Sequence, residues 1–199
     1  MTKRSAMMLL ALLLMFPLSA HAASRSMRYN DNSAPDRVGR FDWGVGVSGA
    51  FNENVDDAVF LSTAIAYGVT PYIAIGVEAG WQEADGADDE TVGFVPILAD
   101  IIVRIPNIHE SIVPYGVLGL GGAGVYVTDD DGEGSSNGDD SDDTGFAWKL
   151  GAGFDWFIDS NWIFNFEFAY WSIDVDLPLT SVGSDASYWT LGVGLKYLF

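Results

Sequence analysis

The stretch YWTLGVGLKYLF, residues 188–199, decides the fold of this chain. Every second residue in it is apolar, and the two ends of the apolar row are aromatic: Trp189, Leu191, Val193, Leu195, Tyr197 and Phe199. The residues between them are small or polar, apart from Leu198. Because side chains alternate between the two faces of a strand, this pattern predicts a strand with one apolar face. An apolar band with aromatic ends is typical of a strand whose outer face contacts lipid.

The same alternation recurs in the segments 41–51, 59–69, 73–82, 95–105, 113–127, 146–156 and 162–170. In most of them the face opposite the apolar one carries glycine, alanine, serine or charged residues, which fits the narrow lumen of a small barrel. In 113–127 both faces carry large apolar residues. There we expect Tyr115, Val117 and Val125 to point outward.

Two kinds of connection alternate between these segments. Those at 53–57, 83–90, 129–143 and 174–187 are polar and mostly acidic, whereas those at 70–71, 106–112 and 159–160 are short or contain proline. The sequence therefore predicts an all-β fold, an eight-stranded antiparallel up-and-down transmembrane β-barrel with short periplasmic turns and long acidic extracellular loops. A soluble lipocalin-like barrel is the alternative, but it would carry its bulky apolar side chains inside.

The N-terminus has the features of an export signal. Lys3 and Arg4 precede an apolar run over 7–18, and residues 20–22 read AHA, a small-residue cleavage site. We expect a cleaved signal peptide over 1–22, a flexible periplasmic tail over 23–39, a barrel domain over 40–199, and a location in the cell outer membrane. The chain has no cysteine, which excludes a lipoprotein anchor and a disulfide framework.

The charge of the chain limits its partners. A formal net charge of −19 disfavours binding to nucleic acid. We expect a monomer whose partners are outer-membrane lipid and lipopolysaccharide. The four acidic connections contain no lysine or arginine. They would therefore contact anionic lipopolysaccharide only through bridging divalent cations, or stand clear of it.

In these features the chain resembles the small outer-membrane barrels of Gram-negative bacteria, the OmpA/OmpX-like superfamily. The resemblance covers about residues 40–199 and includes the terminal YLF. In that family, a last strand ending in phenylalanine is recognised by the barrel-assembly machinery. The resemblance thus implies that this machinery is a partner during biogenesis, with Leu195, Tyr197 and Phe199 as the assembly signal. Because the barrel is expected to occupy residues 40–199, we do not expect the peptidoglycan-binding domain, or the cell-wall anchoring role, of the two-domain members.

Eight charged residues fall on the predicted inner faces of the strands. They carry both signs, and a charge in a narrow lumen is costly unless it is paired or hydrated. We therefore expect a mixed-sign network formed by Asp42, Glu78, Asp100, Arg104, Lys149, Asp155, Glu167 and Lys196. This network would either plug the lumen or line a hydrated conduction path.

The connection 129–143 is the most acidic and contains no run of apolar residues. Some of its oxygen-bearing side chains fall at EF-hand-like spacings, although the apolar position and the helical flanks of an EF-hand are missing. The alternatives are a solvated acidic loop without a cofactor, or weak binding of Ca²⁺ or Mg²⁺ by Asp129, Asp131, Glu133, Asn137 and Asp140.

Residues for catalysis are scarce. Of the two histidines, His21 belongs to the predicted signal peptide and His109 to a predicted periplasmic connection. No serine–histidine or aspartate–histidine pair can be assembled at the extracellular rim. We therefore predict a non-enzymatic protein that contributes to envelope integrity or surface interaction through its acidic loops. The alternatives are a small pore for ions or solutes and an outer-membrane enzyme acting on lipid A or peptides.

Overall fold

The computed structural model describes residues 36–51, 58–85, 90–106, 108–129, 143–174 and 185–199. These residues form eight strands: β1 (Phe41–Phe51), β2 (Ala58–Gly68), β3 (Ile73–Asp85), β4 (Glu90–Arg104), β5 (Ile112–Asp129), β6 (Asp143–Phe157), β7 (Trp162–Asp174) and β8 (Asp185–Leu198). The part of the chain that is described contains no helix long and apolar enough to cross a bilayer.

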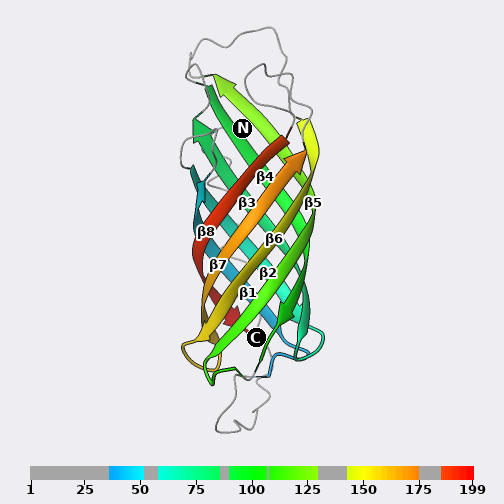
Figure 1. The fold of residues 1–199 in the computed structure, drawn as a ribbon, viewed down its shortest axis with the longest axis vertical. Coiled ribbons are helices and arrows are strands. Elements are labelled where there is room, and N and C mark those ends of the chain that lie inside the picture. Colours follow the sequence, from blue (N-terminus) through cyan, green and yellow to red (C-terminus); the bar gives the residue numbers. More distant parts are fainter. Residues whose placement is uncertain (1–35, 52–57, 86–89, 107, 130–142, 175–184) are drawn as a thin grey trace.

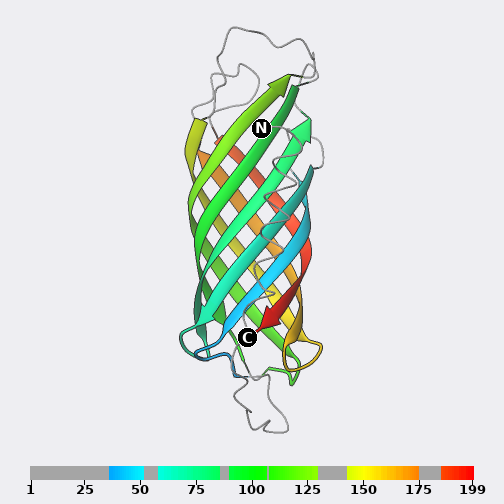
Figure 2. The ribbon, with the colours of Figure 1, turned by 180° about the vertical axis from the view of Figure 1, so that it is seen from behind.

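The strands form one closed barrel in which each strand pairs antiparallel with the next, and β8 returns to pair with β1 (Figures 1 and 2). The predicted all-β fold, a closed eight-stranded antiparallel up-and-down barrel, is therefore confirmed. We call the end with the β2–β3, β4–β5 and β6–β7 connections the turn end, at the bottom of Figure 1. The opposite end, where the strands lead into 52–57, 86–89, 130–142 and 175–184, is the loop end.

Strand β8 has the two faces that its sequence predicts. Trp189 and Val193 are 47% and 41% exposed on the outside, while Thr190 and Leu198 are buried inside. Its neighbours continue this arrangement, because Val193 lies opposite Val47 of β1 and Phe166 of β7. The outside of the barrel is therefore an uninterrupted apolar surface on this side, as lipid contact requires.

The predicted orientation of β5 is wrong. Tyr115, Val117 and Val125 point into the barrel and are at most 4% exposed, whereas Leu118 and Leu120 point outward. Pairing with β4 explains the outcome, because Leu118 lies opposite Ile101. A strand in a closed sheet must share its outward positions with both neighbours, and this constraint decides the orientation where the strand's own pattern is ambiguous.

Several strands extend further at the loop end than their apolar alternation predicts. The expected connections 83–90 and 129–143 are partly strand, since Asp85 pairs with Thr91 and Glu90 pairs with Asp129. Strand β7 likewise continues to Asp174, which pairs with Asp185 of β8. Backbone hydrogen bonding does not need apolar side chains, so the ladder continues where the lipid-facing pattern has ended.

The turns at the turn end are fixed by side chains. Asp159 of the β6–β7 turn accepts hydrogen bonds from the backbone N–H groups of Asn161 and Trp162, each 2.7 Å from Oδ1. These two donors hold the pKa of Asp159 below its usual range. Thr70 makes a similar side-chain contact in the β2–β3 turn, where its hydroxyl oxygen accepts a hydrogen bond from the backbone N–H of Ile73 at 2.9 Å. Such short-range bonds favour the tight reversals that set strand register.

Candidate functional site

The lumen contains a chamber of about 70 Å³ at mid-height. Small residues of β1, β2 and β8 make the room for it on one side: Gly44, Gly46, Ser48, Ser62, Ala64 and Gly192. A Cβ at Gly192 would overlap the side chain of Ser48, so glycine is required for these two strands to approach. Charged side chains from β3, β4, β6 and β7 line the other side.

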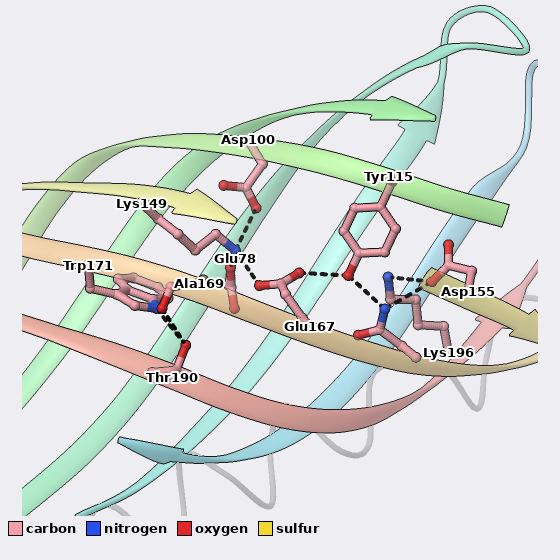
Figure 3. Close-up of polar contacts among 11 residues, drawn as sticks. Glu78, Asp100, Tyr115, Lys149, Asp155, Glu167, Ala169, Trp171, Thr190 and Lys196 are labelled. Atoms are coloured by element: carbon pink, nitrogen blue, oxygen red, sulfur yellow. Dashed lines mark hydrogen bonds and ion pairs between the residues drawn. The ribbon is translucent and has the colours of Figure 1, made fainter. Parts of the chain in front are cut away.

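Lys149 of β6 is the centre of an acidic cluster beside this chamber. Its ammonium group pairs with Glu78 of β3, lies 3.2 Å from Glu167 Oε1 of β7, and lies 4.0 Å from Asp100 Oδ2 of β4 (Figure 3). Lys149 is 2% exposed. One buried cation thus joins three carboxylates from three other strands. We call these four residues the Lys149 cluster.

A second cluster lies nearer the turn end. Asp155 Oδ2 is 2.7 Å from Arg37 Nη1, and Asp155 Oδ1 is 3.1 Å from Lys196 Nζ. Asp42 Oδ2 is 2.8 Å from Arg104 Nη2 and 3.8 Å from Arg37 Nη1. Asp155 and both arginines are buried, so these pairs are shielded from bulk water. We call these five residues the Asp155 cluster.

Two neutral side chains connect the clusters. The hydroxyl of Tyr115 donates to Glu167 Oε2 at 2.7 Å and accepts from Asn165 Nδ2 at 2.7 Å. The same amide nitrogen donates to Asp155 Oδ1 at 3.0 Å. The result is one continuous polar network along the lumen, with the contacts from Asp100 to Asp155 visible in Figure 3.

Buried apolar side chains lie in the lumen on both sides of this network. The loop-side cluster comprises Ala50, Ala58, Phe60, Phe94, Leu98, Ala123, Val125, Ala147, Ala169, Trp171, Ile173 and Tyr188. Within it, the ring centroids of Phe60 and Trp171 are 5.0 Å apart. The smaller turn-side cluster consists of Val113, Phe157, Ile163 and Leu198. The polar network therefore lies between two apolar layers.

A closed eight-stranded barrel with an apolar outside is the architecture of small outer-membrane proteins. The sequence matches the family described as the outer membrane protein beta-barrel domain over residues 8–199. The chain belongs to this family. As a member of this family of outer-membrane barrels, the protein is located in the outer membrane, and the resemblance seen in its sequence is confirmed.

Solved structures agree with this fold. Neisserial surface protein A (NspA) has a TM-score of 0.62 and 14% identity, with 80% of this chain and 96% of that chain covered. Ail, the attachment invasion locus protein of Yersinia pestis, has a TM-score of 0.50 and 15% identity, with 80% and 97% covered. At these identities the similarity concerns the fold alone. A search of curated proteins finds no match to this outer-membrane barrel.

All eight charged residues expected inside the barrel contribute side chains to the two clusters. The expected divalent-cation residues Asp131, Glu133, Asn137 and Asp140 lie outside the described residues, and Asp129 is the last residue of β5. Within the described ranges, no group of three or more histidine, cysteine or acidic residues is placed to hold a metal ion.

Several lumen residues are not predicted by the sequence pattern. Arg37 belongs to the tail predicted over 23–39, but the structure places it inside the barrel. Tyr115 is not predicted as a lumen residue because the predicted orientation of β5 is wrong. Trp171 and Phe60 were missed although the two-residue period, continued from Ala169 and from Ser62, would have placed both inside.

The expected assembly residues lie at the turn end of β8. Leu195 is exposed on the outside, and the ring of Tyr197 lies 5.0 Å from that of Phe199 and 5.0 Å from that of Trp162. The exposed His109 lies in the β4–β5 connection, where its Nδ1 accepts from the backbone N–H of Ser111 at 3.2 Å. That contact uses an amide and therefore does not activate a hydroxyl nucleophile.

Proposed function

We propose that this protein is a closed, non-enzymatic outer-membrane barrel that supports envelope integrity and presents its loop-end connections for surface interaction. The observation that carries the proposal is the filling of the lumen by three successive layers of side chains. These layers are the loop-side apolar cluster, the polar network and the turn-side apolar cluster. Eight strands leave an interior only wide enough for side chains, which supports the same conclusion.

The energetics of the lumen also favour a closed state. An ion that crossed the Lys149 cluster would have to displace contacts between one buried ammonium and three carboxylates, and separating buried pairs is costly. It would then meet the rings of Phe60, Trp171 and Tyr188, an apolar constriction that excludes water. Both barriers lie in series along the barrel axis.

A small pore is the second candidate, and the mid-barrel chamber favours it. A cavity of about 70 Å³ has room for several water molecules, and Glu167 and Lys196 are only partly buried beside it. A hydrated compartment of this kind would become a conduction path if both apolar layers opened. The two candidates therefore differ in whether the layers on either side of the chamber stay closed.

Conductance in a planar bilayer separates the two candidates. We expect the refolded protein to give no channel steps, with or without calcium, because both apolar layers remain in place. The double variant Phe60→Ala/Trp171→Ala opens the loop-side layer alone and keeps every ion pair, so it is also expected to give no channel steps, because the turn-side layer stays closed. Reproducible steps from the unmodified protein, abolished by Asp100→Asn, would establish the pore and overturn the closed barrel.

The surface interaction that we propose depends on divalent cations. All five cationic side chains of the described residues are engaged, four in the lumen network and Arg40 on the carbonyl groups of the C-terminal residues. The outside of the described barrel therefore offers no cation to lipid phosphates. We expect binding of the refolded protein to lipopolysaccharide vesicles to fall several-fold when EDTA removes Mg²⁺. Binding that is unchanged by EDTA would contradict this part of the proposal.

A further inference from the structure

Residues 36–40 form a short segment that folds into the mouth of the barrel at the turn end. The segment is not part of a strand and pairs with the barrel through one isolated bridge, between Val38 and Gly68 of β2. Two backbone hydrogen bonds support this bridge, from Gly39 N to Gly68 O at 2.8 Å and from Gly68 N to Arg40 O at 3.0 Å. The segment therefore covers the β1–β2 side of the mouth.

The side chain of Arg37 extends from this segment into the lumen. Its guanidinium donates to Asp155 Oδ2 at 2.7 Å, lies 3.8 Å from Asp42, and lies 4.7 Å above the ring of Phe157. The turn-side apolar cluster comes from β5, β6, β7 and β8, and Phe157 belongs to it. Arg37 therefore reaches across the mouth from the β1–β2 side and completes its closure against this cluster.

The backbone around the segment is shaped to accept it. Gly39 has a φ of 73°, a left-handed conformation that favours glycine. At Gly68, a Cβ atom would overlap the carbonyl oxygen of Arg37. The contact between Gly68 and the backbone of Arg37 therefore requires a residue without a side chain at position 68. Gly68 carries no charge and lies outside the polar network.

The Asp155 cluster does not need Arg37 for its charge balance. Without it, Asp155 still has Lys196 at 3.1 Å and Asp42 still has Arg104 at 2.8 Å, which leaves two cations for two carboxylates. In the inserted state, the Nε and Nη2 atoms of Arg37 are buried without a hydrogen-bond partner among the described residues. Withdrawal would return these donors to water and would leave no carboxylate unpaired.

We propose that residues 36–39 of this segment are a withdrawable stopper, which closes the turn end of the lumen and, when it leaves, admits water and small cations to the mid-barrel chamber, while Arg40 stays bonded to the carbonyl oxygens of Leu198 and Phe199. The inference rests on the closed lumen of the proposed function. It adds that the turn-side closure is completed by a segment outside the strands, which packs against the turn-side apolar cluster, whereas the loop-side closure is made by strand residues alone.

Cysteine accessibility tests the stopper, because the chain has no cysteine of its own. Ser62→Cys places one thiol on the chamber wall, where a small cationic methanethiosulfonate reagent reports access. We expect slow labelling of this parent and labelling at least ten-fold faster after Arg37→Ala or Gly68→Ala. The matched control is Asp36→Asn, since Asp36 is exposed and its carboxylate accepts from the backbone N–H of Val38 at 3.0 Å, an interaction that an asparagine amide oxygen can also accept.

The two variants act from opposite sides of the same contact. Gly68→Ala changes no charged group, so it keeps the test available if Arg37→Ala fails to refold. Labelling of both folded variants at the slow rate of the parent would overturn the stopper and leave the closed lumen standing. A parent labelled as fast as an exposed cysteine would overturn both the stopper and the closed lumen.

Discussion

Replacement of Lys149 by methionine is expected to lower the free energy of unfolding by about 3–5 kcal/mol, the range for removing one partner of a buried ion pair. Methionine nearly matches the length of the lysine side chain, so the main loss is the charge. Glu78, Asp100 and Glu167 would then share a narrow lumen without their central cation. Urea unfolding in phospholipid vesicles, followed by tryptophan fluorescence, measures the change.

Lys196→Met is the matched control for this prediction. The Lys196 side chain is 17% exposed and has one carboxylate partner, Asp155, which keeps its hydrogen bond to Arg37. A clearly smaller loss is therefore expected. Equal losses from the two substitutions would show that the number of carboxylates around the ammonium does not determine its contribution.

Trp171→Ala is expected to destabilise the barrel by about 3–5 kcal/mol, because it removes the largest side chain of the loop-side apolar cluster and leaves a cavity. Trp171 is 1% exposed, and its ring stacks parallel to that of Tyr188 with centroids 6.1 Å apart. Its Nε1–H also donates to the hydroxyl of Thr190 at 3.2 Å. Both the packing and this hydrogen bond would be lost.

Trp156→Ala on the lipid-facing surface provides the comparison. Trp156 is 50% exposed, and lipid can occupy the volume that its ring leaves. The same urea titration should therefore show a smaller loss for Trp156→Ala than for Trp171→Ala. The opposite order would mean that the lumen interior is loosely packed and that its apolar layer contributes little to closure.

The outer surface of this barrel could be predicted from the sequence because it repeats with a fixed period. Residues such as Val193 and Ile101 face a uniform solvent, lipid, so each strand shows the same rule independently of its neighbours. The prediction failed in β5, where large apolar residues occupy both faces. There the orientation depends on the pairing of Leu118 with Ile101, which is tertiary information.

The lumen was only partly predictable. Charges at inward positions, such as Glu78 and Lys149, are conspicuous in a sequence because an unpaired charge there would be costly. Which charges pair with each other cannot be read from the sequence. The contact between Glu78 and Lys149 joins residues 71 positions apart and depends on how the barrel closes. Arg37 lies outside every alternating segment, so no periodicity marks it as a lumen residue.

The seam between β1 and β8 has a consequence for the order of folding. Residues that are almost the whole barrel apart in sequence, such as Asp42 and Leu198, lie opposite each other in the ladder. Arg40 adds hydrogen bonds to the carbonyl oxygens of Leu198 and Phe199, at 3.1 and 2.8 Å. The ring therefore cannot close until residues 188–199 are present, and β1 must keep an unpaired edge until then. A chain with this topology completes its barrel after synthesis, in a final step that joins its first strand to its last.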